Sequence, residues 1–203
     1  VATDKVDSEV PSPVAGVLQE ILDEEDDTFA PVITSARRRA VSLGINLFTA
    51  FLASWVIGLF QATLQQVVAL AVLMPIVASM GGIAGSQTLI IVLRGLALGQ
   101  VGSTNARWLM YKELAVAALN GIVWALVVAL LATLWFQDIN IGLIIAAALI
   151  INLVCAAIAG FAIPFSLTRL NIDPAHAGTV VLTTVTDVVG FMVFLGMGTI
   201  FLL

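Results

Sequence analysis

Asp187 is the acidic residue of this sequence whose surroundings suit a charge least. It lies in an apolar stretch about twelve residues after Ala175, or about 18 Å along a helix, which would bring it near the middle of a bilayer. A carboxylate at that depth is costly unless it faces water or a partner, so Asp187 is a candidate site. Thr179 and Thr183 precede it at intervals of four residues, so the three side chains share one helix face. The hydroxyls also have a simpler interpretation, since Thr commonly bonds to carbonyls of its own helix.

A second group of small and polar residues lies between Met74 and Arg94. Its proline removes a helix hydrogen bond and its glycines let another helix approach, so carbonyls can be freed where protein or water satisfies them. Small residues alone would indicate only helix packing. Together with the Asp187 carboxylate they favour a route for a hydrated divalent cation, since hard ions suit oxygen ligands. The expected lining of this route is Pro75, Gly81, Gly82, Ile83, Gly85, Ser86, Gln87, Thr186 and Gly190.

Glu113 is another acid in a predicted span. It stands beside Lys112 near one end of that span, where both side chains can reach the membrane interface or pair with each other. Two interpretations stay open, a structural pair and an accessory site for the cation.

The sequence does not predict an enzyme. Its single histidine, His176, has no cysteine or second histidine nearby to complete a metal-ligand set. No GxSxG, HExxH or P-loop pattern occurs. An intramembrane aspartyl protease needs paired catalytic acids, and Asp187 has no evident mate.

The composition is that of an integral membrane protein. Of 203 residues, 61% are hydrophobic and 10% charged, and the mean hydropathy is +1.11. Acids gather between Glu20 and Asp27, so residues 1–36 are expected to form an acidic soluble arm or linker helix, and residues 37–203 a five-span transmembrane pore domain. The acidic run is either a solvated helix end or a low-affinity cation sensor. The net charge of −5 arises mostly in the arm, so it indicates neither nucleic acid nor an acidic partner. As for any integral membrane protein, membrane lipid is an expected partner.

Five apolar segments predict an all-α membrane protein with five transmembrane helices. The expected spans are 40–60, 67–98, 110–136, 141–168 and 175–203, with a short uncharged turn at 61–66. The second span is long and is expected to be interrupted. If it crosses once, all bases from Arg37 onward lie on the side of the N-terminus, which is then cytoplasmic, and the C-terminus is outside. An odd number of spans favours a pore shared between copies, most simply a homodimer.

Three stretches resemble the MgtE magnesium channels and their eukaryotic solute-carrier relatives. They are PIVASMGGIAGSQTLIIVLRGLA, the YKE of Tyr111 to Glu113, and IDPAHAGTVVLTTVTDVVGFMVFLG. The resemblance covers about residues 32–203. It implies a homodimer whose ion path runs between the second and fifth spans. It also implies that Asp187 is the pore aspartate for hydrated Mg²⁺, helped by the main-chain oxygens of Thr183 and Thr179.

Two features depart from the pattern of that family. Ile83 stands where the family usually has the asparagine of GGNAG, so Mn²⁺ and Co²⁺ stay open beside Mg²⁺. The acidic arm stands where the family usually has paired nucleotide-binding-like modules that sense cytoplasmic magnesium. Three hypotheses follow: a dimeric Mg²⁺ channel of the cell membrane, an ion-coupled Mg²⁺ exchanger, and a membrane anchor or assembly subunit without permeation.

Overall fold

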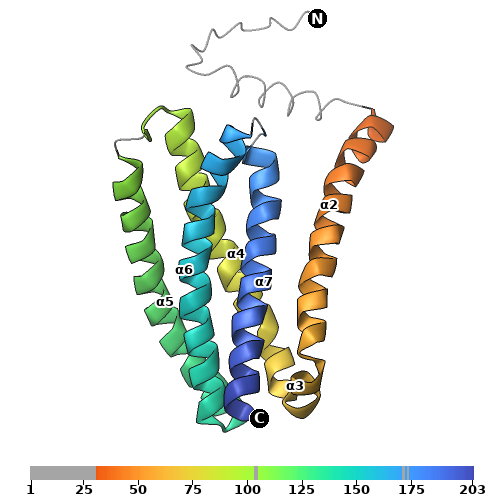
Figure 1. The fold of residues 1–203 in the computed structure, drawn as a ribbon, viewed down its shortest axis with the longest axis vertical. Coiled ribbons are helices and arrows are strands. Elements are labelled where there is room, and N and C mark those ends of the chain that lie inside the picture. The colour runs from red at the N-terminus through yellow and green to blue at the C-terminus, as the bar shows by residue number, and fades with distance from the viewer. Residues whose placement is uncertain (1–30, 103–104, 171, 173) are drawn as a thin grey trace, which may run out of the picture.

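The chain folds into long α-helices. The computed structural model describes residues 31–102, 105–170, 172 and 174–203. The helices are α2 (Val32–Leu59), α3 (Gln61–Gln66), α4 (Val68–Ala97), α5 (Ala106–Phe136), α6 (Ile139–Arg169) and α7 (Pro174–Leu202) (Figure 1). Within the described ranges, five helices are long and apolar enough to cross a membrane, which confirms the predicted all-α class and number of spans. Of the predicted acidic arm, residues 1–30 lie outside the described part.

Successive long helices run in opposite directions through the bundle. Helices α2, α5 and α7 begin at one end, where α4 and α6 finish, and the C-terminus lies at the other end beside α3 (Figure 1). The basic residues of the described helices therefore gather near one end; those whose side chains are described are Arg37, Arg39, Arg94, Arg107, Lys112 and Arg169. Asp138 lies at the opposite end, where its Oδ1 accepts a hydrogen bond of 2.8 Å from the backbone N–H of Asn140 and caps α6.

Helix α6 is the centre of the bundle and packs against α4, α5 and α7. Small residues make these approaches close. A Cβ placed on Gly160 of α6 would lie 2.5 Å from the carbonyl oxygen of Gly85 on α4. One placed on Gly121 of α5 would lie 3.5 Å from the Cα of Ile150 on α6. Glycine at such crossings lets backbones pack by van der Waals contact where lipid offers no hydrophobic gain.

Helix α2 stands at the edge of the bundle and packs chiefly against α7. Its buried apolar residues, Ala53 and Val56, both lie in the second half of the helix. Large side chains of the first half, such as Val41 and Leu43, are exposed. An exposed apolar helix surface is expected where lipid or another membrane-embedded chain is the solvent.

Two predictions, one within the second span and one for the segment before it, are wrong. Helix α4 runs without a break from Val68 to Ala97, with Pro75 inside it. A single proline removes one hydrogen bond, and in lipid the remaining backbone groups are best satisfied by continuing the helix. The segment 61–66 is the short helix α3 and not a turn. It contains no Gly or Pro, and the Thr63 hydroxyl lies 2.8 Å from that of Thr199 on α7.

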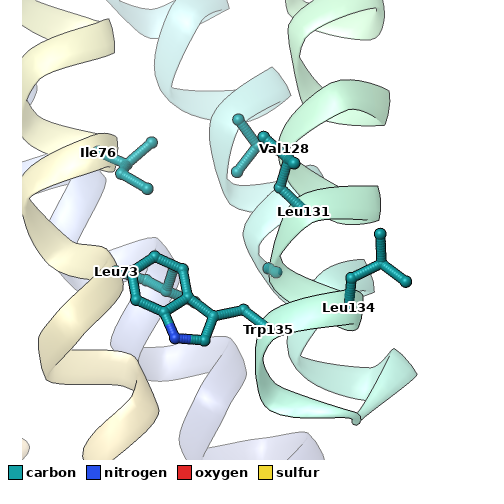
Figure 2. A pocket seen from close by; sticks show the side chains of 7 residues that line it. Leu73, Ile76, Val128, Leu131, Leu134 and Trp135 are labelled. Atoms are coloured by element: carbon teal, nitrogen blue, oxygen red, sulfur yellow. The ribbon is translucent and has the colours of Figure 1, made fainter.

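Helices α4 and α5 touch little, and grooves lie between them. One apolar groove of about 440 Å³ is lined by Leu73, Ile76, Val128, Leu131, Ala132, Leu134 and Trp135. The indole of Trp135 reaches from α5 toward α4, beside Leu73 (Figure 2). This groove has little polar lining, so it differs from the polar features described next.

Candidate functional site

Asp187 lies near the middle of α7, which runs from Pro174 to Leu202. Its side chain is half-buried. Within the described ranges, its carboxylate makes no hydrogen bond and no ion pair. A mid-helix carboxylate without an internal partner is free to interact with water or a hydrated ion, and it would be costly against lipid alone.

The glycine-rich part of α4 lies at the same level as Asp187. A Cβ placed on Gly85 would lie 2.8 Å from Leu182 of α7, and one placed on Gly190 of α7 would lie 3.1 Å from Val77 of α4. Since the two helices run in opposite directions, the residues midway between these two contacts lie at the same level of the bundle. They are Gly81 and Gly82 on α4 and Thr186 and Asp187 on α7. The structure therefore brings together the two stretches that the sequence singled out.

The predicted lining residues of α4 lie on three different faces. Gly81 and Gly85 are buried against α6 and α7. Pro75, Gly82 and Ser86 recur at helical spacing on a less covered face, where a Cβ on Gly82 would meet nothing within 4 Å. The remaining two, Ile83 and Gln87, face a groove toward α5.

The threonines of α7 bond to their own helix. The Thr183 hydroxyl donates to the carbonyl oxygens of Thr179, at 3.0 Å, and Val180, at 3.1 Å. The Thr186 hydroxyl donates to the carbonyl oxygen of Thr183 at 3.1 Å. These bonds confirm the simpler interpretation of the hydroxyls. Thr186 and Gly190 are both buried, whereas Thr179 is exposed and Thr183 is partly so.

Glu113 is buried in the second groove between α4 and α5. This groove has a volume of about 540 Å³, and its polar lining residues are Gln87, Thr88, Lys112, Glu113 and Asn120. The Thr88 hydroxyl donates to Oε2 of Glu113 at 3.2 Å, and Lys112 Nζ lies 3.9 Å from Oε1. The structural pair is thus present, and it is extended to α4 by a hydrogen bond that the sequence did not predict.

Asn152 is a buried polar residue that the sequence reasoning missed. It lies on α6 and is fully buried, and its Nδ2 donates to the carbonyl oxygen of Val77 on α4 at 2.9 Å. Its Oδ1 has no hydrogen-bond partner among the described residues. The signal was available in the sequence, because a lone amide in an apolar span is an expensive residue.

The described residues hold no cluster of three or more His, Cys, Asp or Glu side chains that could bind a metal ion. A cage that strips an ion of its water would need several such ligands. A single carboxylate suits an ion that keeps its water shell, as Mg²⁺ commonly does. His176 lies in the first turn of α7, away from the middle of the helix.

The fold is that of a multi-pass membrane protein whose last described helix carries a half-buried acidic residue near its middle. The chain belongs to the MgtE family, whose family model, described as a divalent cation transporter, matches residues 74–197. The expected family membership is therefore confirmed, and the description is that of a transporter and not of an enzyme.

Three relatives are each named magnesium transporter MgtE. The chain is 31% identical to the one of Bacillus subtilis over 179 residues, 88% of this chain and 40% of that protein. It is 25% identical to the one of Enterococcus faecalis over 199 residues, 98% of this chain and 43% of that protein. It is 27% identical to the one of Thermus thermophilus over 161 residues, 79% of this chain and 35% of that protein. The chain thus spans less than half the length of these relatives.

Proposed function

We propose that two copies of this chain form a channel that passes hydrated Mg²⁺ through a membrane. The path runs between the α4 and α7 helices of the two copies, and each copy contributes one Asp187. The observation that carries the proposal is the carboxylate of Asp187, which lies mid-helix, half-buried and without an internal partner among the described residues.

The chemistry of the site favours a hydrated ion as the transported species. The Asp187 carboxylate attracts the cation and accepts hydrogen bonds from its water shell, and the main-chain oxygens of Thr183 and Thr179 accept others. Direct coordination would require the loss of tightly held water, which Mg²⁺ resists. The partly exposed Thr183 lies about one turn before Asp187 and the exposed Thr179 about two turns before it, so the three groups follow one another along the path.

The proposal of a homodimer rests on the odd number of crossings and on the surfaces that one chain leaves open. The five crossings of the described residues do not divide into two equal inverted halves that could complete a path. The face of α4 that carries Pro75, Gly82 and Ser86 is not fully covered in the single chain, and a Cβ on Gly82 would meet nothing within 4 Å. A second copy related by two-fold symmetry would bring the same face opposite itself.

The orientation follows from the charges. All described bases gather near the end where α2 begins. By the positive-inside rule, that end is cytoplasmic and the C-terminus of α7 is outside. Residues 1–36, of which 32–36 are the start of α2, then form a cytoplasmic arm that leads into the pore domain of residues 37–203.

The test compares Asp187→Asn with Asp138→Asn as its matched control. Both changes replace a carboxylate by an amide of the same shape, and Asn is as good a helix N-cap as Asp. The protein is reconstituted in liposomes with a magnesium-sensitive dye inside. We expect wild type and Asp138→Asn to pass Mg²⁺ and Asp187→Asn to lose at least about tenfold in flux.

The same liposomes separate the competing functions. Flux down a Mg²⁺ gradient without any Na⁺ or proton gradient supports a channel, whereas flux that demands one of these gradients identifies an exchanger. No divalent flux through the wild type would identify an anchor or assembly subunit. Normal flux through Asp187→Asn would overturn the assigned role of the carboxylate, and Mn²⁺ and Co²⁺ competition measures selectivity.

A further inference from the structure

Asn152 occupies the point at which α4, α6 and α7 meet. From α6 its Nδ2 donates a hydrogen bond of 2.9 Å to the Val77 carbonyl oxygen of α4. The side chain is completely buried, and its Oδ1 has no partner among the described residues. A core position that served only to fill space would be better occupied by an apolar side chain, because a half-satisfied buried amide opposes stability.

Two glycines form the space that holds this amide. A Cβ placed on Gly81 of α4 would collide with Asn152 Nδ2 and lie 2.9 Å from its Cγ. A Cβ placed on Gly190 of α7 would lie 2.7 Å from the same Nδ2. The amide is therefore held between α4 and α7 from both sides, and it limits how closely these two helices approach.

Asn152 lies at about the same height in the bundle as Asp187, next to the candidate path. Gly190 follows Asp187 by less than one helical turn on α7. Gly81 lies in the part of α4 that faces the same level. A change in the space between Gly81 and Gly190 would therefore displace the segment that carries Asp187.

We propose that Asn152 is a positioning residue for ion passage, which sets the separation of α4 and α7 and thereby the place of the Asp187 carboxylate. This inference rests on the proposed function of Asp187. Asn152 acts through packing and its hydrogen bond to Val77, and it does not itself contact the ion.

The first test uses the close fit between Gly81 and Asn152. The variants are Gly81→Ala, Asn152→Ala and the double variant, with Gly58→Ala of α2 as control, since a Cβ there meets nothing within 4 Å. Each is measured for Mg²⁺ uptake in bacteria that lack their own magnesium uptake. We expect each single variant at the site to lose about tenfold in uptake, the size of effect typical of residues that act through packing. The double variant should recover most of the loss, because the new methyl group occupies part of the space vacated by the amide.

The second test keeps the branching at Cγ and the number of heavy atoms in the side chain, and removes its polarity. Asn152→Leu abolishes the hydrogen bond to the Val77 carbonyl oxygen. We expect its melting temperature in detergent to equal or exceed that of wild type, while its uptake of Mg²⁺ relative to Co²⁺ changes by about tenfold. A purely structural role would not change the preference between metals in a folded protein.

The outcomes are distinct. The inference is overturned if the double variant is no more active than Gly81→Ala, or if Asn152→Leu keeps both the uptake and the metal preference of wild type. If the Gly81→Ala protein does not fold, Asn152→Leu decides alone. Normal uptake by Asp187→Asn would instead contradict the proposed function, and altered metal preference in Asn152→Leu would still show that Asn152 affects the path.

Discussion

The hydroxyl of Thr183 donates a hydrogen bond of 3.0 Å to the main-chain oxygen of Thr179, one turn earlier on α7. The main-chain oxygen of Thr183 in turn accepts from the hydroxyl of Thr186 at 3.1 Å. These are the two oxygens that we propose to receive hydrogen bonds from the hydrated ion. A carbonyl oxygen has two lone pairs, so the threonine hydroxyls and the water shell of the ion compete for the same acceptors.

Replacing Thr183 by valine removes this competition at Thr179. We expect Thr183→Val to fold normally and to lower the half-saturating Mg²⁺ concentration, by at most about tenfold, since one net hydrogen bond is worth about 0.5–1.5 kcal/mol. The measurement is the concentration dependence of flux in liposomes. Thr183→Ser keeps the hydroxyl and should behave as wild type. An unchanged half-saturating concentration in the valine variant would show that the Thr179 oxygen does not face the ion.

The bond between Thr88 and Glu113 should contribute to stability. Thr88→Val leaves the buried Glu113 carboxylate without its donor from α4, and we expect the free energy of unfolding to fall by about 1–3 kcal/mol. Thermal unfolding in detergent measures it. Thr168→Val is the control, because among the described residues that hydroxyl bonds only to the Pro164 carbonyl oxygen of its own helix, at 2.8 Å. Equal melting temperatures for the two variants would contradict a stabilising role of the bond between the helices.

The crossing of α4 and α6 should not tolerate a methyl group. In Gly160→Ala the new Cβ would lie 2.5 Å from the Gly85 carbonyl oxygen and 3.2 Å from the Leu89 nitrogen, both backbone atoms that cannot rotate away. We expect a loss of about 1–3 kcal/mol in the free energy of unfolding, as is typical of overpacking. Gly44→Ala on α2, where a Cβ meets nothing within 4 Å, should unfold like wild type. A Gly160→Ala protein as stable as this control would mean that the helices separate at no cost.

The hydrogen bond between Thr63 and Thr199 can be measured by a double-mutant cycle. The Thr199 hydroxyl donates to the Leu195 carbonyl oxygen at 2.8 Å, so Thr63 supplies the proton of the bond that joins α3 to α7. With Thr63→Val, Thr199→Val and the double variant, we expect a coupling of about 0.6 kcal/mol, the average for such bonds in membranes. Additive losses would show that the two hydroxyls do not stabilise each other.

Hydropathy alone was sufficient to predict the five long helices, because each must hold a run of apolar residues long enough to cross a bilayer. It was not sufficient for α3. The glutamines of this segment suggest a polar turn, but the segment has no Gly or Pro that would end a helix. The predicted break in α4 was wrong because the prediction assumed that glycine and proline interrupt a helix in a membrane as readily as they do in water. In lipid, an unpaired backbone N–H or C=O group costs more, so the helix continues through these residues.

The sequence also indicated Asp187 correctly as an acid placed at mid-helix, since its position depends only on counting residues along α7. It could not indicate the hydrogen bond from Thr88 to Glu113, which joins residues of two helices that touch little. Nor could it divide the glycines of α4 among faces. The packing partners of Gly81 and Gly85 depend on the tilt of α6 and α7 against α4, which a one-dimensional pattern does not contain.

Helix α2 packs chiefly against α7, and these are the first and the last of the described long helices to leave the ribosome. Ala53 and Val56 share their core cluster with Phe194 and Leu195, residues that are synthesised only at the end of this domain. During biogenesis α2 therefore lies in the bilayer without its main packing partner until α4, α5, α6 and then α7 have been inserted. Packing of α7 against α2 completes the bundle, and a nascent chain that stops before α7 leaves its earliest span without this partner.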